Sequence, residues 1–328
     1  MTDAIVSART WRLLELLADG KFHSGEALAT LLGVSRASVF NALAGADVHG
    51  IRLQRVRGRG YRLACPWQRL ERDEIFRWLG RDGAQFDIEI LPQAPSSNTL
   101  MLQRAAAASS GSVLAVELQT AGRGRMGRIW HSGLGTALTF SLLWRFECGL
   151  NGLSGLSLAV AVAIVRTLDK LGAQGVLLKW PNDILTGHGK LAGVLTEVQG
   201  DVLGPSTVVI GIGLNCAMPA GLEPQIGQPA CALNEVCDAV PTRNQLLAML
   251  LTELGGVLKQ FAKQGFAPFQ GEWERHHAHQ GKPVRLQLGD GQTVDGIARG
   301  VGERGELCLE TAQGMRRFNS GEVGVRQR

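Results

Sequence analysis

The chain has 328 residues, of which 45% are hydrophobic and 19% charged, and its formal net charge is +5. This length and apolar fraction exclude a disordered chain and allow two or three domains. The charge is unevenly placed, because residues 1–66 carry Lys21 and eight arginines against five acidic residues, a net of +4. A local basic excess favours a polyanion-binding segment at the N-terminus over a generally basic protein.

Cysteine usage and hydropathy predict a cytoplasmic protein without a membrane span. The six cysteines are irregularly spaced and include no CxxC pair, which disfavours a zinc ribbon and predicts reduced thiols. The N-terminus lacks the basic-then-apolar pattern of a signal peptide, and no apolar stretch reaches about 18 residues. The apolar run 153–168 contains serine, glycine and arginine and predicts a buried helix.

The N-terminal residues predict a winged helix-turn-helix. Residues 8–18 have helical spacing, and two short helices follow, each preceded by a serine cap, Ser24 and Ser35. The segment 51–63 alternates apolar and basic residues around a glycine-containing turn, which predicts a hairpin. A helix, two helices joined by a tight turn and then a basic hairpin is the order of a winged helix.

Eight side chains of this unit are predicted to contact DNA. Residues of the second short helix would face the major groove, and hairpin arginines would contact phosphates. The predicted contacts are Ser35, Arg36, Ser38 and Asn41 in the helix and Arg55, Arg57, Arg59 and Arg62 in the hairpin. The alternative is an interaction module that binds no DNA. Five arginines from position 52 to 62, with no acidic residue among them, favour DNA.

The rest of the chain predicts an α+β fold. Residues 67–80 predict a connecting helix, and from Phe86 β-rich segments alternate with clustered apolar helices, which favours a mixed sheet. Residues 244–264 predict a further helix. After Trp273, short strands divided by glycine turns predict a small β-barrel. The expected domains are therefore residues 1–66, 67–272 and 273–328.

The loop GRGRMGRIW, residues 122–130, is the strongest sign of a ligand site. Three guanidinium groups on a glycine-rich backbone need anions to become ordered, and Trp130 could cover a flat ligand group. The loop lacks the GxxxxGK[ST] pattern of a Walker A motif, and no acidic residue about twenty positions on supports a dinucleotide site. A solvated basic loop is the alternative, and it leaves Trp130 unexplained.

Three further motifs place polar groups at predicted strand ends. KWPNDIL contains Asn182 and Asp183, and GKLAGVLTE contains Lys190, a movable cation suited to a phosphate or a developing charge. GIGLN has two glycines that could bring the backbone close to a ligand, and it ends in Asn215, whose amide can pair with an adenine edge. Taken singly, each motif has an ordinary alternative, such as a solvated lysine or a tightly packed strand.

In this order, the four motifs closely resemble those of the biotin–protein ligase family, and SSN at 96–98 is similar to its biotin-contacting segment. With the N-terminal unit, the chain resembles the bifunctional members that are both ligase and repressor of biotin biosynthesis genes. The resemblance implies a class II synthetase-like catalytic domain and an SH3-like C-terminal barrel. The implied biotin site is Ser96, Ser97, Asn98, Gln119, Arg123, Gly124, Arg125 and Lys190.

The resemblance also implies a two-step reaction. The biotin carboxylate attacks the α-phosphorus of ATP, with Mg²⁺ on the phosphates, and biotinyl-5′-AMP and pyrophosphate form. A lysine of the biotin carboxyl carrier protein of acetyl-CoA carboxylase then takes the biotin and AMP leaves. Arg123, Arg125 and Lys190 would supply positive charge. Asp183 would orient or deprotonate the acceptor lysine, or hold Mg²⁺, and the sequence does not choose between these roles.

Trp130 would pack on the adenylate and Asn215 would read its adenine. The bound adenylate would act as corepressor and promote a homodimer on operator DNA. Many family members carry a second arginine where this chain has Met126, so part of the loop's charge is missing.

Two other functions stay open at this point. A lipoate-type acyl-adenylate ligase would share the catalytic fold, but the GRGRMG run argues against it. A biotin-sensing transcription factor that has lost catalysis would not need Lys190 and Asp183. The cluster HHAH, residues 276–279, predicts a polar surface turn rather than a metal site.

Overall fold

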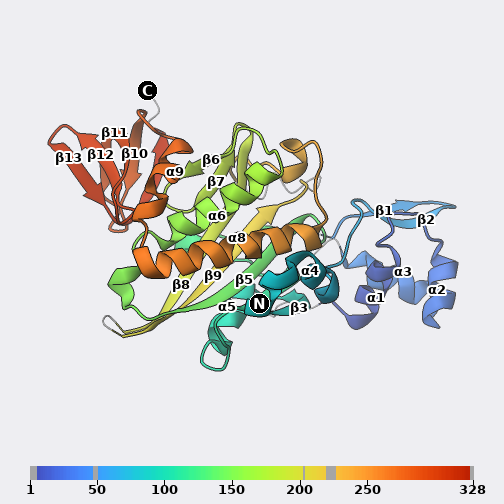
Figure 1. The fold of residues 1–328 in the computed structure, drawn as a ribbon. Helices are drawn as coiled ribbons and strands as arrows, with labels where there is room; N and C mark the ends of the chain where they lie inside the picture. The colour runs from blue at the N-terminus through green and yellow to red at the C-terminus, as the bar shows by residue number, and fades with distance from the viewer. Residues whose placement is uncertain (1–5, 47–50, 202–203, 219–226, 326–328) are drawn as a thin grey trace.

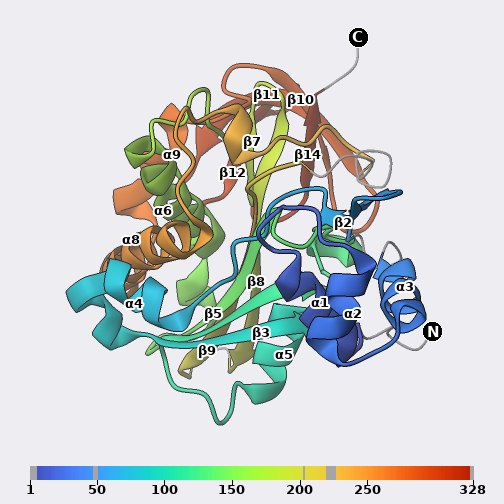
Figure 2. The ribbon, with the colours of Figure 1, turned by 90° about the vertical axis from the view of Figure 1, so that its right-hand side faces the viewer.

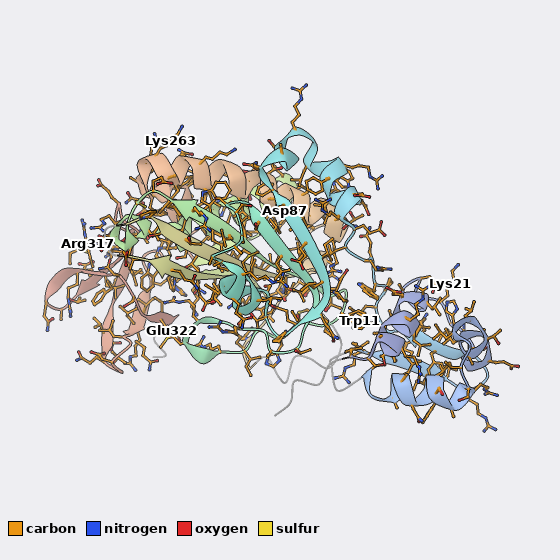
Figure 3. The ribbon with its side chains drawn as sticks, turned by 90° about the horizontal axis from the view of Figure 1, so that it is seen from below. Trp11, Lys21, Asp87, Lys263, Arg317 and Glu322 are labelled. Carbon is orange, nitrogen blue, oxygen red and sulfur yellow. The ribbon has the colours of Figure 1, made fainter. Side chains whose placement is uncertain are left out.

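The structure is a computed structural model that describes residues 6–46, 51–201, 204–218 and 227–325. An N-terminal helical unit lies at one end, a central α+β domain in the middle and a C-terminal β-sheet at the other end (Figure 1). Figure 3 shows the same arrangement from below, with Trp11 in the N-terminal unit and Arg317 in the C-terminal sheet.

The N-terminal unit has three helices and a hairpin, in the predicted order. The helices are α1 (Ala8–Leu16), α2 (Gly25–Leu32) and α3 (Arg36–Ala44), and the hairpin strands are β1 (Leu53–Val56) and β2 (Gly60–Leu63). Helices α2 and α3 meet at 103°, which lies in the range of a helix-turn-helix pair.

The predicted helix ends are confirmed by their capping hydrogen bonds. The Oγ atom of Ser24 accepts from the backbone N of Ala27 at 3.0 Å, and that of Ser35 accepts from Ser38 N at 3.1 Å. Gly33 ends α2 in the left-handed region with φ 63°. Both serines satisfy backbone donors that a helix start leaves unpaired, and glycine takes this φ without steric strain.

The central domain is built on a seven-stranded mixed sheet. Its strands, from one edge to the other, are β3 (Asp87–Ala94), β4 (Ser112–Gln119), β5 (Ala137–Phe146), β9 (Ser206–Asn215), β8 (Gly189–Gly200), β7 (Asp183–Thr186) and β6 (Leu177–Lys179). Strands β3 and β4 are parallel, and the other neighbours are antiparallel. The predicted mixed sheet is therefore confirmed.

Helices cover the two faces of this sheet unequally. Helices α6 (Leu156–Lys170) and α8 (Arg243–Gln264) pack on one face, together with α4 (Arg72–Leu79), and α5 (Ser97–Arg104) lies on the other (Figure 2). Because side chains alternate along a strand, even-numbered residues of β9 such as Ile210 enter the core beside α6 and α8. Its odd-numbered residues face the side of α5.

Helix α6 is the predicted buried helix. The segment Leu150–Lys170 is long and apolar enough to cross a membrane by length and composition, but 61% of that apolar stretch is buried inside the protein. The helix therefore serves as the central element of the core. The predicted helix over 67–80 is shorter than expected and begins at Arg72, because the backbone before it pairs with side chains of the central domain.

The C-terminal strands form one antiparallel sheet. They are β10 (Pro283–Gln287), β11 (Thr293–Val301), β12 (Leu307–Thr311), β13 (Gly314–Phe318) and β14 (Glu322–Val325), in the order β13-β12-β11-β10-β14. Trp180 of the central domain donates its Nε1–H to the carbonyl of Gly305 at 3.0 Å. This buried hydrogen bond ties the loop between β11 and β12 to the strand end that carries the KWPNDIL motif.

The HHAH cluster forms the predicted turn, but the prediction that this turn lies at the surface is wrong. The backbone N of Leu178 donates to the carbonyl of His276 at 2.7 Å, and Ala278 N donates to Leu178 O at 2.9 Å. These bonds cover edge strand β6, so His277 and His279 are only 7% exposed. The pattern was misread because pairing to β6 joins segments about a hundred residues apart.

Burial of these histidines predicts a stability that depends on pH. Desolvation, followed by the nearby imidazole of His277, lowers the pKa of His279 from 6.5 to about 4. Below pH 6.5 the unfolded chain takes up a proton here and the folded chain does not, so the free energy of unfolding falls as pH drops toward 4. Urea denaturation across this range should show the loss, and His279→Gln should make it smaller. An unchanged pH dependence in that variant would contradict the assignment.

A second apolar core joins the N-terminal unit to the central domain. It contains Leu118 and Leu134 of the central domain together with Trp67 and residues of α1 to α3. The rings of Trp11 and Trp67 lie 5.6 Å apart between their centroids. Leu134 is four residues beyond Trp130, so one continuous segment runs from the glycine-arginine loop to this core.

Candidate active site

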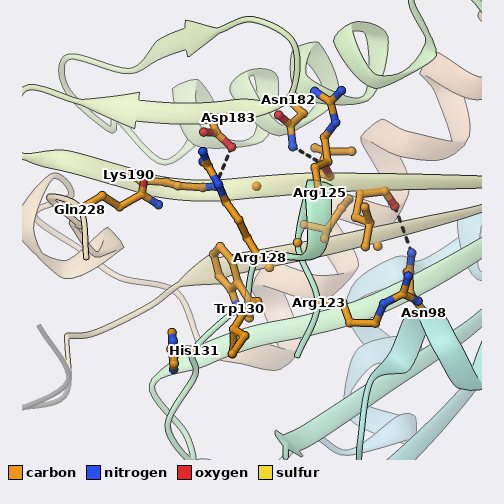
Figure 4. A pocket seen from close by; sticks show the side chains of 18 of the residues that line it. Asn98, Arg123, Arg125, Arg128, Trp130, His131, Asn182, Asp183, Lys190 and Gln228 are labelled. Atoms are coloured by element: carbon orange, nitrogen blue, oxygen red, sulfur yellow. Dashed lines mark hydrogen bonds and ion pairs between the residues drawn. The ribbon is translucent and has the colours of Figure 1, made fainter. Parts of the chain in front are cut away.

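A cavity of about 1130 Å³, counting its open mouth, lies against the sheet between the glycine-arginine loop and the ends of β7, β8 and β9 (Figure 4). Every residue predicted for biotin, adenylate and catalysis lines it, namely Ser96, Ser97, Asn98, Gln119, Arg123, Gly124, Arg125, Trp130, Asp183, Lys190 and Asn215. The structure therefore brings four separate motifs together at one place. The individual role of each residue stays a prediction.

One end of the cavity is a buried network of neutral polar groups at the start of α5. Ser97 and Asn98 are 4% and 3% exposed. Ser141 of β5, which is fully buried, donates to Asn98 Oδ1 at 2.5 Å and lies 2.8 Å from the hydroxyl of Ser97. Gln119 accepts from the backbone N of Ser97 at 2.7 Å. Sequence reasoning missed Ser141, because nothing in its local pattern marks it as facing this site.

The glycines of β8 and β9 make room for protein side chains at the cavity. A Cβ atom on Gly211 would lie 2.2 Å from Asn98 Oδ1, and one on Gly213 would lie 2.5 Å from the indole of Trp130. Larger residues would therefore displace both side chains. The sequence predicts that these glycines bring the backbone close to a ligand. In the structure, the side chains of Asn98 and Trp130 instead lie close to the glycine backbone.

The glycine-arginine loop folds as a short hairpin. The backbone N of Trp130 donates to Gly122 O at 2.9 Å, and Gly124 N donates to Arg128 O at 2.7 Å. The turn at its tip places Met126 at φ 53°, the one positive-φ residue other than glycine among the described residues. Met126 is 60% exposed and is absent from the cavity lining. An arginine at this position would therefore place its charge at the exposed tip of the loop, outside the cavity lining.

Two carboxylates from different strands hold the loop. Arg123 donates to both carboxylate oxygens of Glu197 in β8, at 2.8 Å and 3.3 Å, and to Thr99 Oγ1 at 3.1 Å. Arg128 forms an ion pair with Glu322 of β14. Glu322 and its neighbour also line the cavity. The C-terminal sheet thus contributes directly to the site, which its sequence did not indicate.

The other end of the cavity is cationic. Lys190 Nζ lies 2.6 Å from Asp183 Oδ1 and 5.7 Å from the centroid of the Trp130 ring. A bulge in the pairing of β7 with β8 inserts Leu191. Bulges re-aim neighbouring side chains, so Leu191 enters the core while Lys190 faces the cavity.

Arg125 also lines the cavity, where the charges of Glu322 and Asp183 act on it. Burial lowers the pKa of its guanidinium, while the charges of Glu322 and Asp183 raise it. A guanidinium titrates so far above neutrality that it stays charged despite this burial. A desolvated cation of this kind interacts strongly with a phosphate that enters the cavity.

Asn215 at the end of β9 is held by the backbone. Its Nδ2 donates to Lys190 O at 3.2 Å and to Cys231 O at 3.0 Å. Both amide hydrogens are therefore used, which leaves Oδ1 as its free polar atom. Bidentate pairing with adenine needs a donor as well, so that predicted role would require one of these bonds to exchange.

The candidate DNA-binding residues are placed unequally on the N-terminal unit. Arg36, Asn41 and Arg57 are exposed, whereas the hydroxyls of Ser35 and Ser38 bond each other at 2.9 Å. Two of the hairpin arginines, Arg59 and Arg62, lie over the ring of Phe22 at 4.3 Å and 4.7 Å from its centroid. Arg55 donates to Leu43 O at 2.7 Å. Phe22, which sequence reasoning missed, thus orders the hairpin arginines.

Comparison with known proteins places the site in a family. The Biotin/lipoate A/B protein ligase family matches residues 91–215, and the biotin protein ligase C-terminal domain matches residues 279–326. The chain is 38% identical to the bifunctional ligase/repressor BirA of Escherichia coli over 96% of each chain. It is 32% identical to the biotin–[acetyl-CoA-carboxylase] ligase of Mycobacterium tuberculosis, over 78% of this chain and 94% of that protein.

A solved structure has the same catalytic fold. Biotin protein ligase from Aquifex aeolicus, in complex with biotin and ATP, is 29% identical and superposes with a TM-score of 0.62 over 74% of this chain and 99% of that one. The fold and site are those of a biotin–protein ligase. At 38% identity over nearly its whole length, the chain belongs to the BirA family of bifunctional ligase/repressors.

The position of Arg125 predicts how long the enzyme would retain its intermediate. Arg125→Ala should release biotinyl-5′-AMP roughly tenfold faster or more, because Arg125 is predicted to make a charge-assisted contact to the phosphate that alanine cannot make. Chasing bound radiolabelled intermediate with unlabelled biotin would measure this rate. Arg104→Ala, which removes a surface arginine paired with Glu89, is the matched control. Equal off-rates for the Arg125 variant and the wild type would contradict the assignment.

Proposed function

We propose that this chain is an ATP-dependent ligase that forms biotinyl-5′-AMP and transfers biotin to a lysine of the carboxyl carrier protein of acetyl-CoA carboxylase. The observation that carries the proposal is the division of one cavity into a neutral, hydrogen-bonding end and a cationic end. Biotin has an uncharged ring at one end and a carboxylate at the other, so its shape and charge match this division. BirA of E. coli is named a ligase and repressor, and the Aquifex enzyme binds biotin and ATP.

In this proposal the chain's own residues position and stabilise charge, with no covalent intermediate on the protein. Ser97, Asn98 and Gln119 would bind the ring, while Lys190 and Arg125 would neutralise the carboxylate and the α-phosphate as they approach. Trp130 would cover the adenylate and exclude water, which would protect the activated acyl group from hydrolysis. Asp183, now paired with Lys190, would accept a proton from or orient the acceptor lysine.

Magnesium fits this site only as a partner of the nucleotide. The described residues include no cluster of three or more histidine, cysteine, aspartate or glutamate side chains suited to a metal. Mg²⁺ is commonly held by one or two carboxylates together with substrate phosphates, and Asp183 and Glu322 line the cavity. As the alternative to acting on the acceptor lysine, Asp183 would hold the ion, and Mg²⁺ would neutralise the phosphate oxygens.

The repressor role is proposed for the N-terminal unit, residues 1–66, as a winged helix-turn-helix on operator DNA. It is supported by the 103° angle between α2 and α3 and by the basic hairpin. Biotinyl-5′-AMP would be the corepressor and would promote a homodimer with two recognition helices. Residues 67–272 would form the catalytic domain and residues 273–328 an SH3-like barrel. The use of ATP, the binding of DNA and the free cysteines are consistent with a cytoplasmic location.

Mass measurement of an acceptor domain after incubation with the protein, biotin and ATP tests the ligase proposal. A gain in mass equal to one biotinyl group is expected, and lipoate in place of biotin should give none. No modification with biotin would reject the ligase function. Modification with lipoate would favour the lipoate-type alternative.

A gel shift on the organism's own biotin-gene promoter tests the repressor role separately. Retardation should be stronger when biotin and ATP are both present, because the adenylate promotes the dimer. Arg57→Ala should weaken binding and lower its salt dependence, since it removes one phosphate contact. Absence of retardation in both states would reject the role.

A further inference from the structure

Glu197 of β8 is a partly buried carboxylate that stands directly behind the neutral end of the cavity. It accepts from Arg123 through both carboxylate oxygens, at 2.8 Å and 3.3 Å, and from Asn98 Nδ2 at 3.0 Å. Its side chain is 23% exposed. Arg123 and Asn98 both line the cavity, and Glu197 is not among the lining residues. The carboxylate therefore acts on a ligand through these two side chains.

Glu197 helps to set the direction of the Asn98 amide. Asn98 Nδ2 donates to Glu197 and also to the carbonyl of Leu195 at 3.2 Å, and Oδ1 accepts from Ser141 at 2.5 Å. A carboxylate and a carbonyl can only accept, so a rotated amide would set its oxygen against two acceptors. Such a rotation leaves buried polar atoms unpaired and is strongly disfavoured. Asn98 is thus held in one orientation before any ligand arrives.

Glu197 also cancels the charge of Arg123. The guanidinium and carboxylate form the two-pronged contact that is the strongest arrangement of such a pair. At the other end, four cations line the cavity against two carboxylates, namely Lys179, Lys190, Arg125 and Arg128 against Asp183 and Glu322. The cavity is therefore uncharged where Asn98 lies and positive where Lys190 lies. Without Glu197, an unpaired Arg123 would attract the carboxylate of a ligand to the wrong end.

We propose that Glu197 is a positioning residue for biotin. It holds Arg123 and Asn98 so that this end of the cavity takes an uncharged ring and directs the ligand's carboxylate to the Lys190 end. The inference rests on the proposed ligase function. Glu197, the last residue of the GKLAGVLTE motif, lies outside the cavity lining. The inference nevertheless gives it a part in substrate specificity.

Steady-state kinetics of Glu197→Gln test the inference. A glutamine side chain turns its NH₂ group toward one of the two donors, so at least one contact is lost while the size is kept. The KM for biotin should rise roughly tenfold to a hundredfold, as expected for loss of a buried hydrogen bond to a charged group. The KM for ATP and the kcat of pyrophosphate release should stay within about twofold, because the cationic end is unchanged.

Glu89→Gln is the matched control, since Glu89 forms an exposed pair with Arg104 at 2.6 Å in the same domain, and its constants should equal those of the wild type. If Glu197→Gln does not fold, Glu197→Asp keeps the charge, reaches only one of the two donors and should raise the KM for biotin alone by a smaller factor. An unchanged biotin KM, a parallel change in both KM values or a loss confined to kcat would overturn the inference. A wild-type protein that never transfers biotin would instead overturn the proposed function.

Discussion

Replacing Lys190 with alanine should slow adenylation by roughly a hundredfold to a thousandfold, the range seen when one preorganised donor to a developing negative charge is removed. Lys190 is the lysine that the β8 bulge turns toward the cavity, and its ammonium lies 2.6 Å from Asp183. No other described cation touches that carboxylate. When biotin and ATP bind, the same ammonium would face the reacting carboxylate and α-phosphate. Pyrophosphate release in a single turnover measures the step without the transfer reaction.

Two further variants separate this role from simple neutralisation of Asp183. Lys190→Ala with Asp183→Ala removes both charges, so it would recover adenylation if the lysine only balanced the aspartate. We expect no recovery. Lys170→Ala removes an exposed lysine that pairs with Glu253 on the opposite face of the sheet, and it should leave the rate unchanged. Normal pyrophosphate release by Lys190→Ala would remove Lys190 from the mechanism.

The positions of residues within a motif could be predicted from the sequence, because the local backbone structure sets the direction of their side chains. Ser24 and Ser35 cap helices through contacts three residues away. Three of the four motifs end or begin a strand of the same sheet, so Asp183, Lys190 and Asn215 reach one cavity, and the fourth lies in the loop between β4 and β5 beside them. Hydrophobic periodicity and helix-capping residues therefore predict where helices and strands end, and so which side chains lie at the end of a sheet.

Partners from distant segments could not be placed in this way. Glu322 is 194 residues from Arg128, and Ser141 reaches Asn98 only through the register of β5 and β9. The histidines after α9 (Gln270–Arg275) were misjudged because their local sequence pattern does not show that they pair with the edge strand β6. Asn215 was assigned to adenine from its chemistry, yet its donors serve the backbone. Tertiary pairing decides which polar groups remain free for a ligand.

Arg243→Ala should lower the free energy of unfolding by roughly 3–5 kcal/mol, because it leaves a buried carboxylate without its partner. Arg243 begins α8 and is 5% exposed, and its Nη1 lies 2.6 Å from Glu117 Oε2. Glu117 also accepts from Trp67 Nε1 at 3.1 Å and from Leu70 N at 2.6 Å. This pair therefore holds the segment that connects the N-terminal unit to the sheet. Urea denaturation of the full chain would measure the loss.

The size of that effect distinguishes a fully buried pair from a partly exposed one. Arg166 pairs with Glu272 at 2.7 Å but is 34% exposed, so Arg166→Ala should cost about 1 kcal/mol or less. Adding Glu117→Gln to Arg243→Ala removes the stranded charge and keeps an acceptor for Leu70 N, so it should recover part of the loss. Equal losses for Arg243→Ala and Arg166→Ala would mean that burial adds nothing to this contact. Recovery in the double variant would show instead that the unpaired charge of Glu117, rather than lost packing, causes the instability.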